Sequence, residues 1–349
     1  MENSSYKLSY YSPKYSYIIY LSLNVTKFLQ EIIDASRPKP HVDGITMVLD
    51  RISIFPREEV EAVAQYIDVA KIGWGIPFIM ESGNVKNWVD QWRRMGVSVS
   101  NGGTLLEYCI TKGKQETCIR KLAALGFGTL EISEGVIEIS RAEKKTMVGL
   151  AKSLGMRVHI EVGKKDSRNQ LTLNATLERI RAALDMDIDI VIVEGRESGK
   201  GVAIYDESGN IKWDWVDAIV SEFGLKKIMF EAPQEFQQTS LIIRLGKEVN
   251  LGNIALSSVA ALETQRQSLR GDTFGIHPTQ PDISGGPSPR FVYFIISSHG
   301  TIDQDRIMKL TGLNRRTTQN SLSSLIRQGL IRETRDMTDL RRKLYSISS

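Results

Sequence analysis

Charged side chains stand directly after short apolar runs in this sequence. The clearest example is the β-branched run 190–193, which ends at Glu194 and continues into a glycine-rich loop that carries Arg196 and Lys200. A run that is apolar at every position is typical of a strand buried on both faces, and a carboxylate at the end of such a strand needs a partner. The loop cations either cap the sheet in a salt bridge or form, together with Glu194, a site for a ligand.

The same combination of an apolar run and a polar end recurs along the chain. The other residues of this kind are Asp50, Lys71, Asn101, Glu131, Ser133, His159, Glu161, Glu231 and Ser257. So many carboxylates repel one another at low dielectric unless lysines, arginines or a divalent ion lie between them. Oxygen ligands without a Cys or His cluster favour Mg²⁺ over Zn²⁺. We interpret His159 as a core histidine.

Strand-like and helical segments alternate from residue 44 onward, which predicts an α/β protein with a parallel sheet. The expected strands are 45–50, 67–72, 97–100, 128–133, 157–162, 188–194, 227–231 and 253–257. The expected helices are 57–65, 85–95, 114–125, 141–154, 172–185, 213–223, 235–248 and 258–269. Eight such units favour a closed (β/α)₈ TIM barrel, in which chemistry belongs to the carboxyl ends of the strands. A doubly wound open sheet is the alternative.

The composition of the 349-residue chain is that of an ordinary globular protein, with 41% hydrophobic and 25% charged residues. No apolar segment reaches the roughly 20 residues of a membrane span, and the N-terminus lacks the pattern of a signal peptide. We therefore expect a cytoplasmic protein in which Cys109 and Cys118 are buried, reduced thiols. Residues 1–38 are interpreted as an N-terminal extension, and residues 39–276 as the barrel.

A proline- and glycine-rich linker, 277–289, precedes a basic C-terminal segment, 290–349. From Pro287 onward there are eleven Lys and Arg residues against five Asp and Glu residues, so the basic surplus of the chain lies here. The segment is expected to form three helices, at 290–298, 303–310 and 314–328, and then a two-stranded basic wing. This order predicts a winged helix-turn-helix domain.

Duplex DNA is the expected partner of this segment. Base and phosphate contacts are expected from the start of the recognition helix, at Arg315, Arg316, Thr317 and Gln319. Phosphate contacts are expected from the wing, at Arg341, Arg342 and Lys343. The alternative is a protein-interaction module with a solvated basic face.

Seven short motifs occur in order over residues 43–276. They are 71–75 (KIGWG), 102–105 (GGTL), 131–133 (EIS), 161–165 (EVGKK), 194–201 (EGRESGKG), 230–234 (FEAPQ) and 269–275 (LRGDTFG). Together they resemble the phosphosulfolactate synthase family. The resemblance implies a (β/α)₈ barrel and a carbon–sulfur lyase that uses Mg²⁺. Such an enzyme adds sulfite to phosphoenolpyruvate, which gives 2-phospho-3-sulfolactate, an early step towards coenzyme M. The relatives also suggest a small homo-oligomer.

This reaction needs a metal, because negative charge develops at C2 and at the carboxylate of phosphoenolpyruvate. We expect Glu161 and Glu194 as ligands, with Asp50 or Glu231 completing the set. Any of these carboxylates could instead be a structural partner of a lysine or arginine.

The reaction also needs a proton donor for C2 and a site for the anions. Lys164 is the first candidate for the acid and Lys71 the second, and either could instead be a charge partner of a neighbouring glutamate. The candidates for anion binding are Arg196, Lys200, Gln234, Ser257 and Arg270. Arg270 could equally contact a neighbouring subunit.

Two other functions fit the same sequence. One is a transcriptional regulator whose barrel senses a phosphorylated or sulfonated small molecule. The other is a barrel with protective or interaction duties and no turnover. Retained acidic and basic residues at the strand ends favour catalysis, whereas the basic C-terminal segment favours the regulator.

Overall fold

The computed structural model describes residues 39–51, 56–166, 170–273, 283–336 and 342–348, all of which belong to one compact unit, Arg37–Ser349. The predicted N-terminal extension, 1–38, and residues 277–282 of the predicted linker lie outside the described residues. Among the described residues, no helix is long and apolar enough to cross a membrane.

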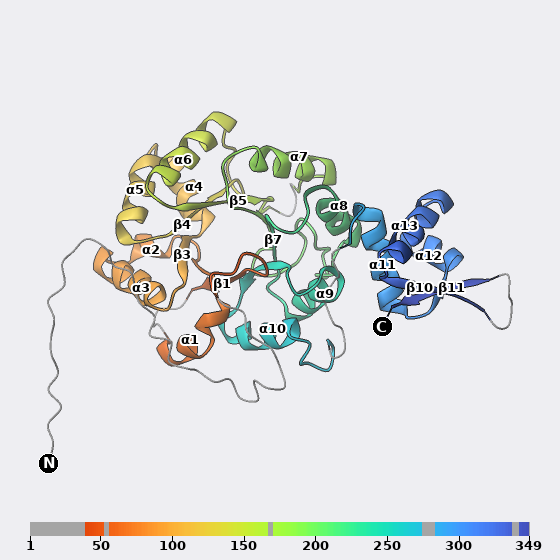
Figure 1. Ribbon diagram of the computed structural model, residues 1–349. Coiled ribbons are helices and arrows are strands. Elements are labelled where there is room, and N and C mark those ends of the chain that lie inside the picture. The colour runs from red at the N-terminus through yellow and green to blue at the C-terminus, as the bar shows by residue number, and fades with distance from the viewer. Residues whose placement is uncertain (1–38, 52–55, 167–169, 274–282, 337–341, 349) are drawn as a thin grey trace, which may run out of the picture. The chain divides into compact units, whose positions relative to one another are not determined.

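Eight parallel strands form a closed barrel in chain order, and the last strand pairs with the first (Figure 1). The strands are β1 (Thr46–Asp50), β2 (Val69–Ile72), β3 (Ser98–Asn101), β4 (Thr129–Ser133), β5 (Arg157–Val162), β6 (Ile190–Val193), β7 (Ile228–Glu231) and β8 (Asn250–Ile254). The predicted (β/α)₈ barrel is therefore confirmed, and the open doubly wound sheet is wrong.

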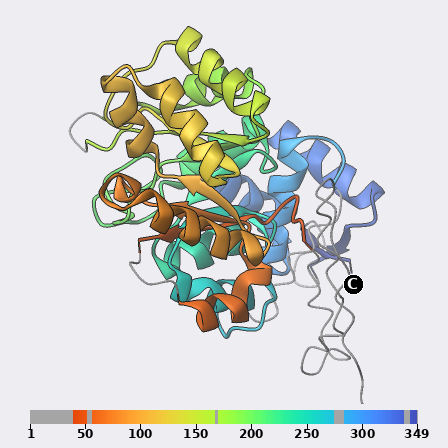
Figure 2. The same ribbon diagram turned by 90° about the vertical axis from the view of Figure 1, so that its left-hand side faces the viewer.

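Helices surround this ring of strands, as the view along the barrel (Figure 1) and the view from the side (Figure 2) both show. They are α1 (Arg57–Val63), α2 (Ile76–Ile79), α3 (Ser82–Arg94), α4 (Gly103–Thr111), α5 (Gln115–Leu125), α6 (Arg141–Ser153), α7 (Leu173–Leu184), α8 (Trp213–Phe223), α9 (Glu235–Leu245) and α10 (Val259–Arg266). Two short 3₁₀ helices, η1 (Ala64–Tyr66) and η3 (Leu256–Ser258), follow α1 and β8.

Alternation along the strands sorts side chains between two layers. The residues that face the barrel interior form a small apolar cluster of their own: Met47, Val69, Ile190, Ile192 and Met229. Their strand neighbours of opposite parity pack against the helices in the main core. Two positions further along the interior face, at the carboxyl ends of β2, β6 and β7, stand Lys71, Glu194 and Glu231. We call this end of the barrel the mouth.

The last strand differs from the prediction, since it spans Asn250–Ile254 rather than 253–257. The asparagine at its start interrupts the apolar pattern by which a strand is recognised in a sequence. The side-chain oxygen of Asn250 accepts a hydrogen bond from the Ile45 amide (2.9 Å), and its amide group donates to the Ile228 carbonyl (2.9 Å). A buried asparagine is thus satisfied by the backbones of the neighbouring segments. Ser257 consequently lies in η3 rather than at a strand end.

Helix α4 was not predicted, although it carries part of the mouth. It begins at Gly103, directly after Asn101 and Gly102, with Gly102 at its N-cap. Cys109 on α4 and Cys118 on α5 are both buried free thiols, as expected.

The C-terminal elements have a separate apolar core. In chain order they are α11 (Pro287–His299), β9 (Ile302–Asp303), α12 (Gln304–Thr311), α13 (Arg315–Arg327), β10 (Ile331–Arg335) and β11 (Lys343–Ile347). The strands form a small antiparallel sheet in the order β10-β11-β9. Helix α13 starts at the expected place because the side chain of Asn314 caps it by accepting from the Thr317 amide (2.9 Å).

Candidate active site

A buried ammonium group lies at the centre of the mouth. The Nζ atom of Lys71 is 3.0 Å from Glu131 Oε1, 3.2 Å from Glu161 Oε2 and 2.9 Å from Glu231 Oε1. Burial alone would lower the pKa of Lys71, but the three carboxylates outweigh it and raise that pKa well above its usual value. Lys71 is therefore a firmly held cation that allows three acidic strand ends to meet.

Glu161 is the most strongly paired of these carboxylates. Burial would raise its pKa, but the ammonium groups of Lys165 and Lys71 outweigh burial and hold the pKa below its usual range. Glu161 Oε1 also accepts a hydrogen bond from the Ser133 hydroxyl (2.7 Å). It remains an ionised carboxylate at neutral pH.

Two other carboxylates each keep one oxygen unused. Glu131 Oε2 and Glu194 Oε2 are buried and accept no hydrogen bond from the described residues. Burial raises the pKa of Glu131 to about 7, although Lys71 opposes this shift. Burial and the nearby Glu161 and Glu231 raise the pKa of Glu194 well above its usual value. Glu194 Oε2 therefore lacks the positive partner that a buried carboxylate needs, and a bound cation would supply it.

The charges at the mouth are unbalanced. The buried glutamates 107, 131, 161, 194 and 231 face only two ammonium groups of the described chain, those of Lys71 and Lys165. Glu161, Glu194 and Glu231 each offer an oxygen, and these oxygens lie within 4.8 Å of one another. An oxygen-only set with an unused buried atom on Glu194 suits a hard divalent cation.

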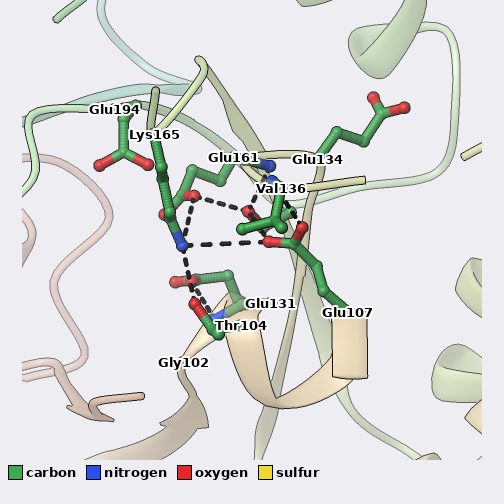
Figure 3. A network of polar contacts seen from close by, with 12 residues as sticks. Gly102, Thr104, Glu107, Glu131, Glu134, Val136, Glu161, Lys165 and Glu194 are labelled. Atoms are coloured by element: carbon green, nitrogen blue, oxygen red, sulfur yellow. Dashed lines mark hydrogen bonds and ion pairs between the residues drawn. The ribbon is translucent and has the colours of Figure 1, made fainter. Parts of the chain in front are cut away.

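The second ammonium group belongs to Lys165, not to Lys164. Lys165 Nζ donates to Thr104 Oγ1 (3.0 Å) and lies 3.7 Å from Glu161 Oε1 and 3.9 Å from Glu107 Oε1 (Figure 3). Lys164 Nζ instead donates to the Glu134 carbonyl (2.9 Å) and pairs with Glu138. The structure thus brings Lys165, and not the first catalytic candidate Lys164, to the carboxylates, because the interior parity of Glu161 continues to Lys165.

Asp50 is not part of the carboxylate group. Its Oδ2 atom accepts hydrogen bonds from the indole nitrogens of Trp88 (2.8 Å) and Trp92 (2.6 Å), both on α3. Because Met47 faces the barrel interior, Asp50 has the opposite parity and faces the helix layer. The expectation of Asp50 as a metal ligand is wrong, whereas Glu231 does join Glu161 and Glu194.

The loop after β6 begins at the mouth and carries Arg196 and Lys200. Its start is fixed by two carboxylates, since the Gly195 amide donates to Glu231 Oε2 (2.9 Å) and the Arg196 amide donates to Glu194 Oε1 (2.7 Å). A Cβ atom at Gly195 would lie 2.5 Å from the Glu231 carbonyl oxygen, so only glycine permits this approach. Arg196 is partly exposed and Lys200 is exposed.

The other three candidates for anion binding are Gln234, Ser257 and Arg270. The Gln234 amide group donates to the Ser198 carbonyl and so ties the β6 loop to the start of α9. Ser257 is exposed in η3. Arg270 pairs with Glu235 and, at 3.3 Å, with Asp272. Gln234 and Arg270 are therefore occupied by contacts within the chain.

In the C-terminal segment, Arg315, Arg316 and Gln319 are exposed on α13, and Thr317 is partly exposed. Arg315 forms an ion pair with Asp305 (3.2 Å). Lys343 pairs with Glu333 (2.8 Å), and Arg342 pairs with Asp303. Arg341 lies outside the described residues. Two of the expected wing cations are thus partly neutralised within the chain.

Two residues of the network were missed in the sequence, Lys165 and Glu107. The parity of β5 was a usable signal for Lys165. Glu107 lies in the middle of α4, more than twenty residues before the loop it contacts, and no strand-end pattern identifies it. Its position depends on how α4 packs beside β4.

Comparison with known proteins gives a consistent result over the barrel. The profile of the (2R)-phospho-3-sulfolactate synthase (ComA) family matches residues 34–272. A phosphosulfolactate synthase of Methanocaldococcus jannaschii is 41% identical over 236 residues, which cover 66% of this chain and 94% of that protein. Those of Methanothermobacter thermautotrophicus and Bacillus subtilis are 40% and 30% identical, each over 68% of this chain and over 93% and 94% of their own lengths.

Replacement of Lys71 by methionine should destabilise the protein by about 3–5 kcal/mol at neutral pH, because it leaves buried carboxylates without their common partner. The loss should shrink as the pH falls, since a buried carboxylate that has lost its cationic partner becomes neutral on protonation. Urea unfolding at several pH values measures both effects. Lys86→Met is the control, because Lys86 forms only an exposed pair with Asp90, and it should change stability little. Equal effects of the two changes would contradict the central role of Lys71.

Proposed function

Because the chain belongs to the (2R)-phospho-3-sulfolactate synthase family, we propose that it is a Mg²⁺-dependent carbon–sulfur lyase that joins sulfite to phosphoenolpyruvate. The product is 2-phospho-3-sulfolactate, which leads towards coenzyme M. The observation that carries this proposal is the set of buried carboxylates around Lys71 and Lys165 at the mouth of the barrel. Such a set can hold a cation against an anionic substrate and supply a proton beside it.

The reaction is an addition across the C2=C3 bond. The sulfur lone pair of sulfite forms the new bond to C3, and the π electrons move to C2 and the carboxylate, where they form an enediolate. C2 then takes one proton, and the phosphate ester stays in place. The protein must therefore stabilise charge near the carboxylate and deliver a proton to C2.

Mg²⁺ would be held by Glu161, Glu194 and Glu231, whose oxygens lie close together, and the unused oxygen of Glu194 supports this choice. When bound there, the ion would act as a Lewis acid towards the enediolate. Glu131 is assigned a structural role. Its Oε1 atom pairs with Lys71 and accepts a hydrogen bond from the Gly103 amide (2.8 Å), so it connects β2 to the start of α4.

Lys165 is the proposed proton donor. Its side chain is 28% exposed, which gives substrate access to the ammonium group, whereas Lys71 is enclosed by three carboxylates. Burial lowers the pKa of Lys165, but Glu161 and Glu194 raise it above its usual value. A cation bound to Glu161 and Glu194 would offset the negative charges that raise the pKa of Lys165. A lysine with a lowered pKa is a better acid.

The two anions would lie under the β6 loop. Arg196 and Lys200 are its available cations, and both are at least partly exposed. The loop is also held by neighbouring segments of the barrel, because the Trp74 indole donates to Glu197 Oε1 (2.6 Å) and the Asn253 amide group of β8 donates to the Arg196 carbonyl (3.3 Å). A guanidinium on such a loop suits a phosphate or a sulfonate.

A second function, duplex DNA binding, is proposed for the C-terminal segment. The order of its elements, helix, short strand, two helices and two strands, is that of a winged helix-turn-helix domain. Exposed Arg315, Arg316 and Gln319 at the start of α13 support this proposal, because the start of a recognition helix supplies contacts to bases and phosphates.

Turnover of phosphoenolpyruvate with sulfite and Mg²⁺ tests the first proposal. Lys165→Ala should lower kcat by at least about 100-fold, the usual contribution of a general acid. Lys164→Ala removes the same charge one residue earlier and should cost much less. The decline of the enol absorbance follows both reactions. An unmodified protein without turnover, or equal losses in the two variants, would contradict the assignment.

Mg²⁺ should raise the thermal midpoint of unfolding, because a ligand that binds only the folded state stabilises it by about 2.7 kcal/mol at 100 times its Kd. The rise should be lost in Glu194→Gln and kept in Glu138→Gln, whose side chain is 65% exposed. It should also weaken as the pH falls, because the raised pKa of Glu194 lets protons compete with the ion. Differential scanning fluorimetry measures all three effects, and an equal rise in both variants would place the ion elsewhere.

Arg315→Ala combined with Arg316→Ala should weaken binding to duplex DNA and reduce the slope of log K against log salt by about 2, if each arginine contacts a phosphate. Arg57→Ala combined with Arg120→Ala is the control, because these exposed arginines form pairs within barrel helices. Fluorescence anisotropy at several salt concentrations gives both slopes. An unchanged slope in the first variant would rule out α13 as the recognition helix.

A further inference from the structure

Glu107 is a buried carboxylate on α4 that the reaction outlined above does not use. It is only 2% exposed, yet it lies on a helix rather than at a strand end. Its Oε2 atom accepts hydrogen bonds from the backbone amides of Val136 (2.7 Å) and Ile137 (3.0 Å). Its Oε1 atom accepts from the Ser133 hydroxyl (2.9 Å) and faces Lys165 (Figure 3). Both oxygens of Glu107 are thus directed at the β4–α6 loop and the lysine.

Ser133 connects Glu107 to the carboxylate group. Its hydroxyl oxygen lies 2.9 Å from Glu107 Oε1 and 2.7 Å from Glu161 Oε1, and it accepts from the Gly135 amide (3.2 Å). A hydroxyl has one proton, so it donates fully to only one of the two carboxylates. The ammonium group of Lys165, within 4 Å of both oxygens, supplies the remaining positive charge. The four side chains form a single network.

The stem of Lys165 is confined by the same loop. A Cβ atom at Gly135 would lie 2.8 Å from three carbons of the Lys165 side chain, so the loop backbone packs directly on the stem. The Lys165 amide also donates to the Gly135 carbonyl (3.1 Å). The ammonium end meets two side chains of α4, Thr104 and Glu107, which lie one turn apart. Glu107 is the group that touches both the loop and the ammonium.

We propose that Glu107 is a positioning residue for Lys165: its negative charge holds the ammonium group on the α4 side of the mouth, while its hydrogen bonds hold the loop 134–137 against the lysine stem. The proposal rests on the assignment of Lys165 as proton donor. Without the charge of Glu107, the ammonium group is attracted towards the strand-end carboxylates Glu161, Glu194 and Glu131. It would then move towards the oxygens that are proposed to hold the cation.

Glu107→Gln separates this role from a purely structural one. The amide oxygen of glutamine can still accept from Val136 and Ile137, and its NH₂ group can donate to Ser133, which then donates to Glu161. Every hydrogen bond of the loop is therefore kept, whereas the negative charge is lost and an N–H group faces Lys165. A residue that only fastens the loop would tolerate this change.

Steady-state kinetics with phosphoenolpyruvate, sulfite and Mg²⁺ are the first test. We expect Glu107→Gln to lower kcat by about 10- to 100-fold, less than removal of Lys165 itself, because the proton donor is displaced and not lost, with KM changed by less than about threefold. Glu134→Gln is the matched control on the same loop. Glu134 is also buried, but it binds the Ile139 amide and Lys144, and its side chain points away from Lys165 (Figure 3). Its kcat should stay within about twofold of the unmodified value.

A double-mutant cycle with Lys165→Ala then tests whether Glu107 acts through the lysine. In the Lys165→Ala background, Glu107→Gln should lower kcat no further, because the group it positions is gone. An unchanged kcat in the single Glu107→Gln variant would overturn the proposal. Fully additive losses would overturn it too, because Glu107 would then act independently of Lys165.

A measurement that needs no turnover keeps this proposal separate from the proposed reaction. NMR of ¹⁵N-labelled lysine ammonium groups at low temperature detects those held in ion pairs, and loss of one signal in Lys165→Arg assigns it. We expect that signal to shift or broaden in Glu107→Gln, while the Lys71 signal stays in place. An unchanged Lys165 signal would overturn the positioning role. A shifted signal in a protein without turnover would overturn the reaction instead.

Discussion

The mouth of the barrel depends on one ammonium group surrounded by three carboxylates. Lys71 on β2 contacts glutamates on β4, β5 and β7, which without it would repel one another in a buried space. Ionised groups are expensive to remove from water, and the arrangement is tolerable only because each has a close partner. The acidic strand ends can therefore converge, and the interior of the mouth is rigid before any ligand arrives. Every other feature of the site builds on this contact of one ammonium group with three carboxylates.

Beyond that centre the charges do not cancel. One oxygen of Glu194 and one of Glu131 are buried without a hydrogen-bond donor among the described residues. The remaining ammonium group, that of Lys165, donates to Thr104 on α4. Thr104 and Glu107 on α4 fasten its end, and the backbone at Gly135 confines its stem. The mouth thus combines a fixed cation in its interior with a second one whose position depends on a helix and a loop. That division suits a reaction in which one cation organises the site and another moves a proton.

Individual residues show which parts of the site could be predicted from the sequence. The acidic ends of β5, β6 and β7 were predictable, because a charged residue after a short apolar run can be recognised in the sequence without knowing which strands are neighbours. Alternation from Glu161 could have shown that Lys165, and not Lys164, lies beside the carboxylates. Asp50 could not be excluded in this way. Its strand is apolar on both faces, and only the packing of Trp88 and Trp92 shows that it faces the helices. Strand β8 was misplaced because its asparagines conceal it.

The sequence by itself determined the eight-unit barrel, the kinds of charge at its mouth and the membership of its family, since these follow from local periodicity and from short motifs. Tertiary structure alone decided which charges meet. The contacts of Glu107 with Ser133 and the Val136 and Ile137 amides join segments 26 to 30 residues apart. Such contacts depend on strand register and on how α4 packs against the barrel, because a hydrogen bond or a buried ion pair requires distances of a few ångströms that no local pattern specifies.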